Sequence, residues 1–152
     1  MFHKLTVSIA LAASFALTAH AADPGRHYVE APAPASGPAL PFSEAVTVGD
    51  TVYIAGHLGQ DPKTMKIPES AEAESRFVLD AIKHTVEAAG LHMDDLVSVT
   101  VYCTDLTLYD TFNGVYRTYF HDHFPARAFI GVAQLVRGAR IEVSAIAVKP
   151  AH

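Results

Sequence analysis

Hydrophobic and polar residues alternate along several short stretches of the chain. The alternation is clearest from Val97 to Cys103, where valines and the cysteine are separated by polar side chains. A period of two is typical of a β-strand with one buried face. Four further stretches are predicted as strands: 44–48, 51–55, 126–135 and 139–148. A glycine and an aspartate separate the first two of these, which predicts a tight hairpin turn.

Two other stretches carry apolar side chains at spacings of three and four residues, which is typical of an amphipathic helix. The first runs from Ser70, a suitable N-cap, to Ala89. Gly90 follows it, in the position where a left-handed residue ends a helix. The second stretch runs from about Leu108 to Phe120.

The predicted element order is β-β-α-β-α-β-β. Strands that bracket two helices predict an α+β domain, with a single sheet and both helices on one face. Two helices cannot cover both faces of such a sheet, and the strand residues 97–103 and 141–148 carry few charges on their second face. We therefore expect the open face to meet another subunit in a homo-oligomer.

The N-terminal residues predict an export signal. A short basic start at 1–4 precedes an apolar run at 5–18, and Ala19-His20-Ala21 offers small side chains to a signal peptidase. The run is shorter than the roughly 20 residues of a membrane-spanning helix, although a retained membrane anchor is the alternative. We expect cleavage after Ala21 and a periplasmic or secreted protein without membrane contact.

Residues 22–41 are predicted to be a leader. They carry five of the chain's nine prolines among alanines and show no apolar periodicity, which favours an extended conformation. We expect the folded domain to span 42–150 and to begin near Phe42.

Composition limits the classes of function. The 152 residues are half hydrophobic, and 16 acidic against 11 basic side chains give a net charge of −5. This length predicts one domain. Without a basic patch, the negative charge argues against a nucleic-acid partner. The single cysteine, Cys103, excludes an intrachain disulfide and is expected to pack inward as a small strand residue.

The sequence contains no phosphate loop, dinucleotide fingerprint, nucleophile elbow or paired-cysteine metal motif. His121 and His123 form the only local histidine pair of the folded part. No third ligand is indicated by spacing, so a solvated loop is favoured over a metal site.

A set of short motifs runs in order through the domain. They are Pro41-Phe42-Ser43-Glu44-Ala45, Tyr53-Ile54-Ala55-Gly56, Thr100-Val101-Tyr102, Phe112-Asn113-Gly114-Val115-Tyr116, Phe124-Pro125-Ala126-Arg127 and Ile141-Glu142-Val143-Ser144-Ala145-Ile146-Ala147. Together they resemble the RidA (YjgF) family over about 41–149. The resemblance implies a chorismate-mutase-like subunit in a homotrimer, with clefts between subunits that bind small carboxylates. It also implies hydrolysis of 2-imino acids and their enamine tautomers to 2-keto acids and ammonia, with no cofactor or metal.

By this resemblance, Arg127 anchors the substrate carboxylate. A guanidinium group stays charged and presents paired donors to a carboxylate in a fixed geometry. Gly56 matches a glycine whose backbone lines the cleft, and Asn113 matches a cleft asparagine. Phe42 stands where the family often has tyrosine, so the ring is kept and the hydroxyl is lost.

Two positions depart from the family pattern. Phe129 occupies a place where many members have a small residue, and its ring would narrow the cleft. Ser144 occupies the place of a glutamate thought to hold the attacking water, and with Arg127 it is predicted as a catalytic residue. A serine can hydrogen-bond water but lacks the basicity of a carboxylate, and general-base assistance is commonly worth about 10²–10⁴-fold. Glu142 lies about 7 Å away along the same strand face, and we expect it to form a structural ion pair.

The sequence is compatible with three functions. The leading hypothesis is an enamine/imine deaminase in which Arg127 holds a 2-imino acid while water attacks the imine carbon. The alternative is a non-catalytic trimer that binds a small 2-keto acid through the same arginine. An endoribonuclease, a label attached to some relatives, is disfavoured by the negative charge and the absence of a basic groove.

Overall fold

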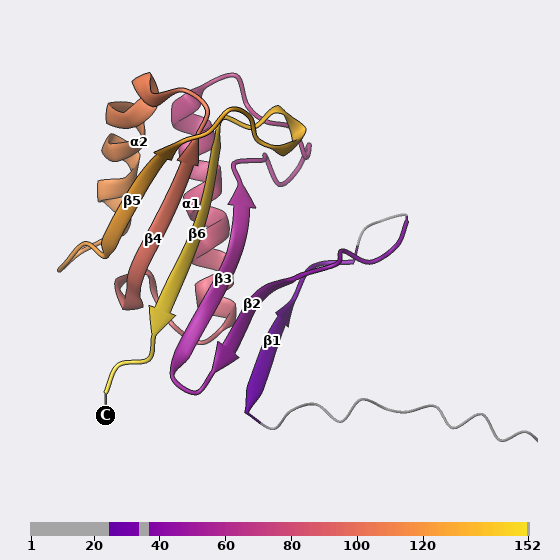
Figure 1. The fold of residues 1–152 in the computed structure, drawn as a ribbon, viewed down its shortest axis with the longest axis vertical. Helices are drawn as coiled ribbons and strands as arrows, with labels where there is room; N and C mark the ends of the chain where they lie inside the picture. The colour runs from indigo at the N-terminus through magenta and orange to yellow at the C-terminus, as the bar shows by residue number, and fades with distance from the viewer. Residues whose placement is uncertain (1–24, 34–36, 152) are drawn as a thin grey trace, which may run out of the picture.

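The structure is a computed structural model that describes residues 25–33 and 37–151. The predicted signal at 1–21 lies outside these residues, as does part of the predicted leader. The described chain folds into one six-stranded sheet, and both helices lie on the same face of it (Figure 1). None of the helices in these two ranges is long and apolar enough to cross a membrane.

The strands are β1 (Arg26–Glu30), β2 (Ser43–Val48), β3 (Thr51–Leu58), β4 (Leu96–Cys103), β5 (Ala126–Gly131) and β6 (Ile141–Val148). Their order across the sheet is β1-β2-β3-β6-β4-β5, and only the β4–β5 pair is parallel. The predicted hairpin joins β2 and β3 at Gly49, whose φ of 59° is a conformation that glycine adopts without strain. The predicted α+β class and single sheet are confirmed.

The sheet begins earlier than Phe42. β1 lies within the segment predicted as a leader and pairs with β2 in antiparallel register, from Arg26 opposite Val48 to Glu30 opposite Ser43. Its position depends on backbone pairing with the edge of β2 rather than on an amphipathic pattern of its own, so periodicity does not reveal it. At the other edge, β5 ends at Gly131 instead of 135.

The first helix, α1 (Ala71–Ala88), matches its prediction closely. The Ser70 side chain accepts a hydrogen bond from the Ala73 backbone N, and Gly90 follows the helix with φ 81°. The second helix, α2 (Tyr109–Tyr116), is shorter than predicted because 3₁₀ turns replace both of its ends. The 3₁₀ turns of the described residues are η1 (Met93–Asp95), η2 (Leu106–Leu108), η3 (Arg117–Tyr119) and η4 (Val136–Gly138).

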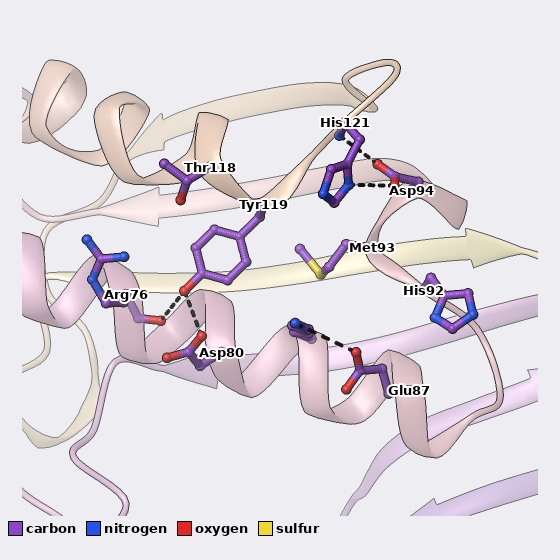
Figure 2. A pocket seen from close by; sticks show the side chains of 10 residues that line it. Arg76, Asp80, Glu87, His92, Met93, Asp94, Thr118, Tyr119 and His121 are labelled. Carbon is purple, nitrogen blue, oxygen red and sulfur yellow. Dashed lines mark hydrogen bonds and ion pairs between the residues drawn. The ribbon is translucent and has the colours of Figure 1, made fainter.

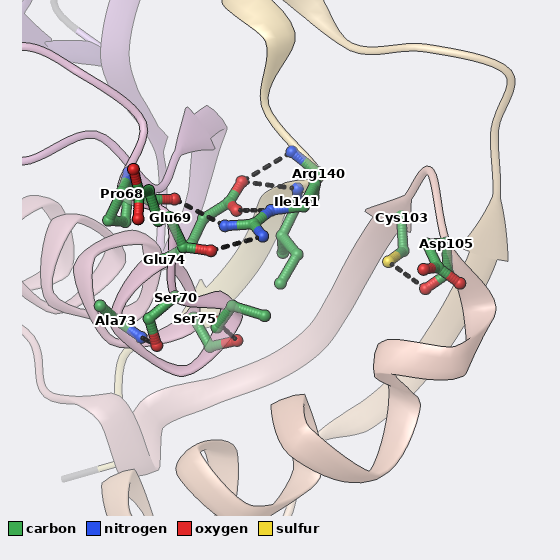
Figure 3. Close-up of polar contacts among 11 residues, drawn as sticks. Pro68, Glu69, Ser70, Ala73, Glu74, Ser75, Cys103, Asp105, Arg140 and Ile141 are labelled. Atoms are coloured by element: carbon green, nitrogen blue, oxygen red, sulfur yellow. Dashed lines mark hydrogen bonds and ion pairs between the residues drawn. The ribbon is translucent and has the colours of Figure 1, made fainter.

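A buried carboxylate joins α1 to the start of β6 (Figure 3). Glu74 is fully buried and accepts hydrogen bonds from the backbone N of Arg140 (2.7 Å) and of Ile141 (3.0 Å). It also accepts one from Nε of Arg140 (2.6 Å). The same guanidinium donates to the carbonyl oxygens of Pro68 and Glu69. These bonds hold the loop before α1, the first turn of α1 and strand β6 in one arrangement.

The hydrophobic core lies between the sheet and the two helices. Cys103 is fully buried in it, as predicted, and burial raises the pKa of its thiol. The opposite face of the sheet exposes large apolar side chains, including Tyr53 (51%) and Ile130 (41%). That this face meets another subunit stays a prediction.

Candidate functional site

Arg127 lies on the edge strand β5, and its side chain extends on the helix side of the sheet. Its neighbour on β4 is Val99, a core residue. The guanidinium carbon lies 4.5 Å from the centre of the Tyr116 ring. Three further rings surround that carbon, those of Phe112 (5.7 Å), Tyr109 (5.8 Å) and Phe129 (5.8 Å). Cation–π attraction to these rings holds the charged group in place.

One polar side chain orients this guanidinium. Nη2 of Arg127 donates a hydrogen bond of 2.6 Å to Oδ1 of Asn113, which lies on α2. In the described part of the chain Arg127 forms no ion pair. A half-buried cation without an acidic partner keeps its remaining donors and its charge for an anionic ligand.

A cavity of about 250 Å³ lies beside Arg127. Its lining residues are Asn113, Tyr116, Arg117, Phe124, Pro125 and Arg127. Aromatic rings form one wall, because Tyr116 and Phe124 stack with centres 6.2 Å apart. Among the residues that the structure describes, no acidic one lines the cavity. Apolar walls with a few fixed donors suit a small organic anion.

Several lining residues are absent from the predicted site. Tyr116, Arg117 and Phe124 all line the cavity, yet the sequence predicts only Asn113 and Arg127 there. The sequence does offer one clue to these three residues. They lie inside or next to the two motifs that contain Asn113 and Arg127. Burial raises the pKa of Tyr116 to about 12, so its phenol stays neutral near the cation.

Ser144 lies on the other face of the sheet from Arg127. Its neighbour on β4 is Thr100, whereas that of Arg127 is Val99, and consecutive strand residues point to opposite faces. Ser144 lines a separate cavity of about 170 Å³ on the open face, together with Tyr53. One chain therefore does not bring its two predicted catalytic residues together.

Gly56 lies at an irregularity of the sheet beside Ser144. The register of β3 against β6 shifts between Ile54 and His57. Two β3 residues, Ala55 and Gly56, then lie opposite one β6 residue, Ser144, which is a β-bulge. The structure thus brings these two predicted site residues together, on the open face.

Glu142 reaches the same bulge. A Cβ atom on Gly56 would collide with Oε1 of Glu142, so a glycine at this position leaves room for the carboxylate. The ion pair predicted for Glu142 is wrong: within the described ranges it has none, because its strand neighbours are Leu58 and Tyr102. Burial raises the pKa of its carboxyl. Glu142 is therefore an acid next to the bulge that the sequence did not assign to the site.

The two predicted phenylalanines lie apart. Phe129 packs in the aromatic group around Arg127, with its ring centre 5.1 Å from that of Tyr109 and 5.6 Å from that of Phe112. In the single chain its ring does not line the 250 Å³ cavity. Phe42 precedes β2, is half exposed and lines neither cavity.

A larger hollow of about 520 Å³ lies between α1 and η1. Figure 2 shows several of its polar groups paired with one another. Tyr119 donates to Asp80 (2.7 Å) and to the Arg76 carbonyl (3.2 Å), and His121 bonds Asp94 (3.0 Å). None of the predicted site residues lines it, and across the described residues no group of three or more potential metal ligands occurs. The candidate site is therefore the cavity at Arg127.

Comparison with known proteins agrees with the predicted family. A family model described as Endoribonuclease L-PSP matches residues 30–149. The 2-iminobutanoate/2-iminopropanoate deaminase of Escherichia coli K12 is 38% identical over 112 residues, which cover 72% of this chain and 88% of that protein. The Homo sapiens protein of the same name is 37% identical over 118 residues, covering 77% and 86%.

Solved structures show the same fold. The YjgF gene product of E. coli matches with a TM-score of 0.73 at 35% identity, over 82% of this chain and 99% of that one. E. coli TdcF with bound serine matches with a TM-score of 0.73 at 31% identity, over 82% and 100%. The family model covers most of the chain, and the two deaminases are 37–38% identical to it over the aligned residues. This protein therefore belongs to the Endoribonuclease L-PSP family, which includes the proteins named RidA and YjgF.

Proposed function

We propose that this protein is an imine/enamine deaminase that hydrolyses small 2-imino acids to 2-keto acids and ammonia. The observation that carries the proposal is the guanidinium of Arg127, which is oriented by Asn113, surrounded by aromatic rings and free of any acidic partner in the described chain. The names of relatives at 37–38% identity support the reaction. The serine bound to TdcF supports a site for a small carboxylate.

The proposed site needs two subunits. Arg127 lies on the helix side of the sheet, whereas Gly56, Glu142 and Ser144 lie on the open face. A cleft in which β5 of one copy faces the open sheet of the next would place both sets of groups around one substrate. The exposed apolar side chains of that face favour such an assembly, and we propose a homotrimer.

The proposed chemistry relies on positioning. Arg127 binds the carboxylate of the 2-imino acid, and backbone groups at the Gly56 bulge orient the imine. Water adds its oxygen to the imine carbon and a proton to the nitrogen, and the resulting carbinolamine releases ammonia and leaves the 2-keto acid. Ser144 hydrogen-bonds the water, and Glu142 is the acid nearest to it along β6. Fixed geometry alone supplies a large share of such a rate enhancement.

We place this activity outside the cytoplasm, because residues 1–21 have the pattern of a cleaved export signal. Mass spectrometry of the protein recovered from cell fractions tests this. A chain beginning at Ala22 in the periplasm or medium is expected, and a full-length chain in the cytosol would contradict it.

The deaminase is tested by supplying purified mature protein with 2-iminopropionate generated in situ and measuring ammonia release. Release above the buffer rate is expected, and Arg127→Ala should lower the enzymatic part by at least about tenfold, because it removes charge-assisted hydrogen bonds to the substrate. Lys66→Ala, at an exposed loop position, is the control. Ammonia release at the buffer rate, with pyruvate still bound, would replace the deaminase by the non-catalytic carboxylate-binding protein.

A further inference from the structure

A second arginine lines the cavity beside Arg127. Arg117 opens η3, directly after α2, and its guanidinium carbon lies 5.8 Å from the centre of the Phe124 ring. Both arginines line the same cavity of about 250 Å³. Neither has an acidic partner among the residues that the structure describes.

These two arginines form a local cluster of positive charge in an acidic chain. The protein carries more acidic than basic side chains overall. Two of the other arginines are paired, Arg76 with Glu72 and Arg140 with Glu74. Two cations around a small cavity without an acid repel each other and create a positive potential there, which an anion relieves on binding.

The two arginines share one aromatic wall. Tyr116 and Phe124 stack at an interplanar angle of 23°, with Arg127 over the first ring and Arg117 over the second. Both guanidinium groups therefore lie against the same pair of stacked rings. The small volume of the cavity means that one ligand with an anionic group at each end can meet both charges.

We propose that this site selects dicarboxylates, namely 2-imino acids of four or five carbons that carry a second carboxylate at the end of the side chain. Arg127 holds the carboxylate next to the imine carbon, and Arg117 holds the distal one. Arg117 is thus a specificity-determining residue of the proposed deaminase and takes part in no bond change. The inference rests on the proposed function for the reaction, but its binding part is tested without it.

The test is isothermal titration calorimetry, which measures the affinity of the mature protein for 2-oxoglutarate and for 2-oxopentanoate. The second compound has the same five-carbon chain without the second carboxylate. We expect 2-oxoglutarate to bind about tenfold more tightly at low ionic strength, since a hydrogen bond between charged groups is worth about that factor or more. Raising the salt concentration should reduce this preference because Arg117 is exposed.

Variants test whether Arg117 causes the preference for 2-oxoglutarate. Arg117→Gln should abolish the advantage of 2-oxoglutarate and leave the affinity for 2-oxopentanoate within about twofold, while Arg117→Lys should keep part of it. Lys66→Gln removes one positive charge from an exposed loop and should change neither affinity. Circular dichroism of each variant confirms folding.

Two results would overturn the inference: equal affinities of the wild-type protein for the two keto acids, or equal weakening of both by Arg117→Gln. Different results would contradict the proposed deaminase function. Ammonia release at the buffer rate would contradict the deaminase reaction. Binding of 2-oxopentanoate by Arg127→Ala with wild-type affinity would contradict the role of Arg127 in holding the substrate carboxylate.

Discussion

At the level of single residues, Ser144 and Gly56 share one irregularity of the sheet. The bulge places two β3 residues opposite Ser144, and Glu142 approaches Gly56 from the same face. A hydroxyl group binds water but does not take up a proton near neutral pH. The proposed reaction therefore lacks a strong base at position 144.

Ser144→Glu tests this directly. We expect the variant to release ammonia from 2-iminopropionate about 10²-fold faster than the wild-type protein, because general-base assistance commonly contributes that factor or more. Ser144→Gln is the matched control, since its side chain has the same size without the basicity. An equal gain in both variants, or no gain in either, would show that water activation does not limit the rate.

At the level of elements, two buried polar clusters join α1 to the sheet. One is the Glu74 cluster at the start of β6. The other joins Glu44 of β2, His57 of β3 and Thr85 of α1, with Nε2 of His57 3.2 Å from both Oε2 of Glu44 and Oγ1 of Thr85. Both clusters hold strands that carry site residues, so we expect them to affect the site through its geometry.

Glu74→Ala should lower the free energy of unfolding by about 3–5 kcal/mol, because it removes the acidic partner of Arg140 and leaves Nε of Arg140 and two backbone N–H groups without their acceptor. Urea unfolding followed by circular dichroism measures this. Glu72→Ala, two residues earlier and in an exposed pair with Arg76, should cost less than about 1 kcal/mol. Similar losses in both variants would show that the buried cluster contributes little.

The His57 cluster predicts a pH dependence. Burial lowers the pKa of His57 below its ordinary 6.5, outweighing the raising effect of Glu44, and His84 lowers it further. The unfolded chain then takes up a proton at a pH where the folded protein does not, so stability should fall as the pH drops below about 6.5.

Thermal melts between pH 7.5 and 5.5 measure this dependence. His57→Gln should flatten the fall in melting temperature over that range, whereas His123→Gln, at an exposed position, should leave it as in the wild-type protein. A His57→Gln profile parallel to the wild-type one would assign the titration to another group.

At the level of the whole molecule, the sheet separates the two halves of the proposed site. Arg127 and Asn113 belong to the helix side, and Gly56 and Ser144 to the open face. An active site that needs both halves needs two copies of the chain. Such a site can be restored by combining chains that are damaged in different halves.

Mixed assemblies test this. Arg127→Ala and Gly56→Val chains, each expected to be inactive, should regain about a quarter of the wild-type rate when refolded together, since random pairing leaves that fraction of clefts intact. Arg127→Ala with Asn113→Ala is the control, because both changes damage the same half and no intact cleft forms. Recovery in neither mixture would place the whole site within one chain.

Much of the fold follows from local patterns. The alternation around Val97–Cys103, the capping by Ser70 and the turn at Gly49 each predict an element that the structure contains. β1 is different, because its five residues become a strand only through pairing with β2. The length of α2 likewise depends on how its ends pack rather than on its apolar spacing.

The sequence by itself determined the α+β class, the order of the main elements and the family, and through the family resemblance it predicted Arg127 as the anion-binding group. Only the tertiary structure decided which faces the site residues share. It separated Arg127 from Ser144, placed Glu142 at the bulge and put Arg117 beside Arg127. The physical reason is that periodicity reports which side of an element is buried, whereas strand register and helix packing decide which distant residues meet.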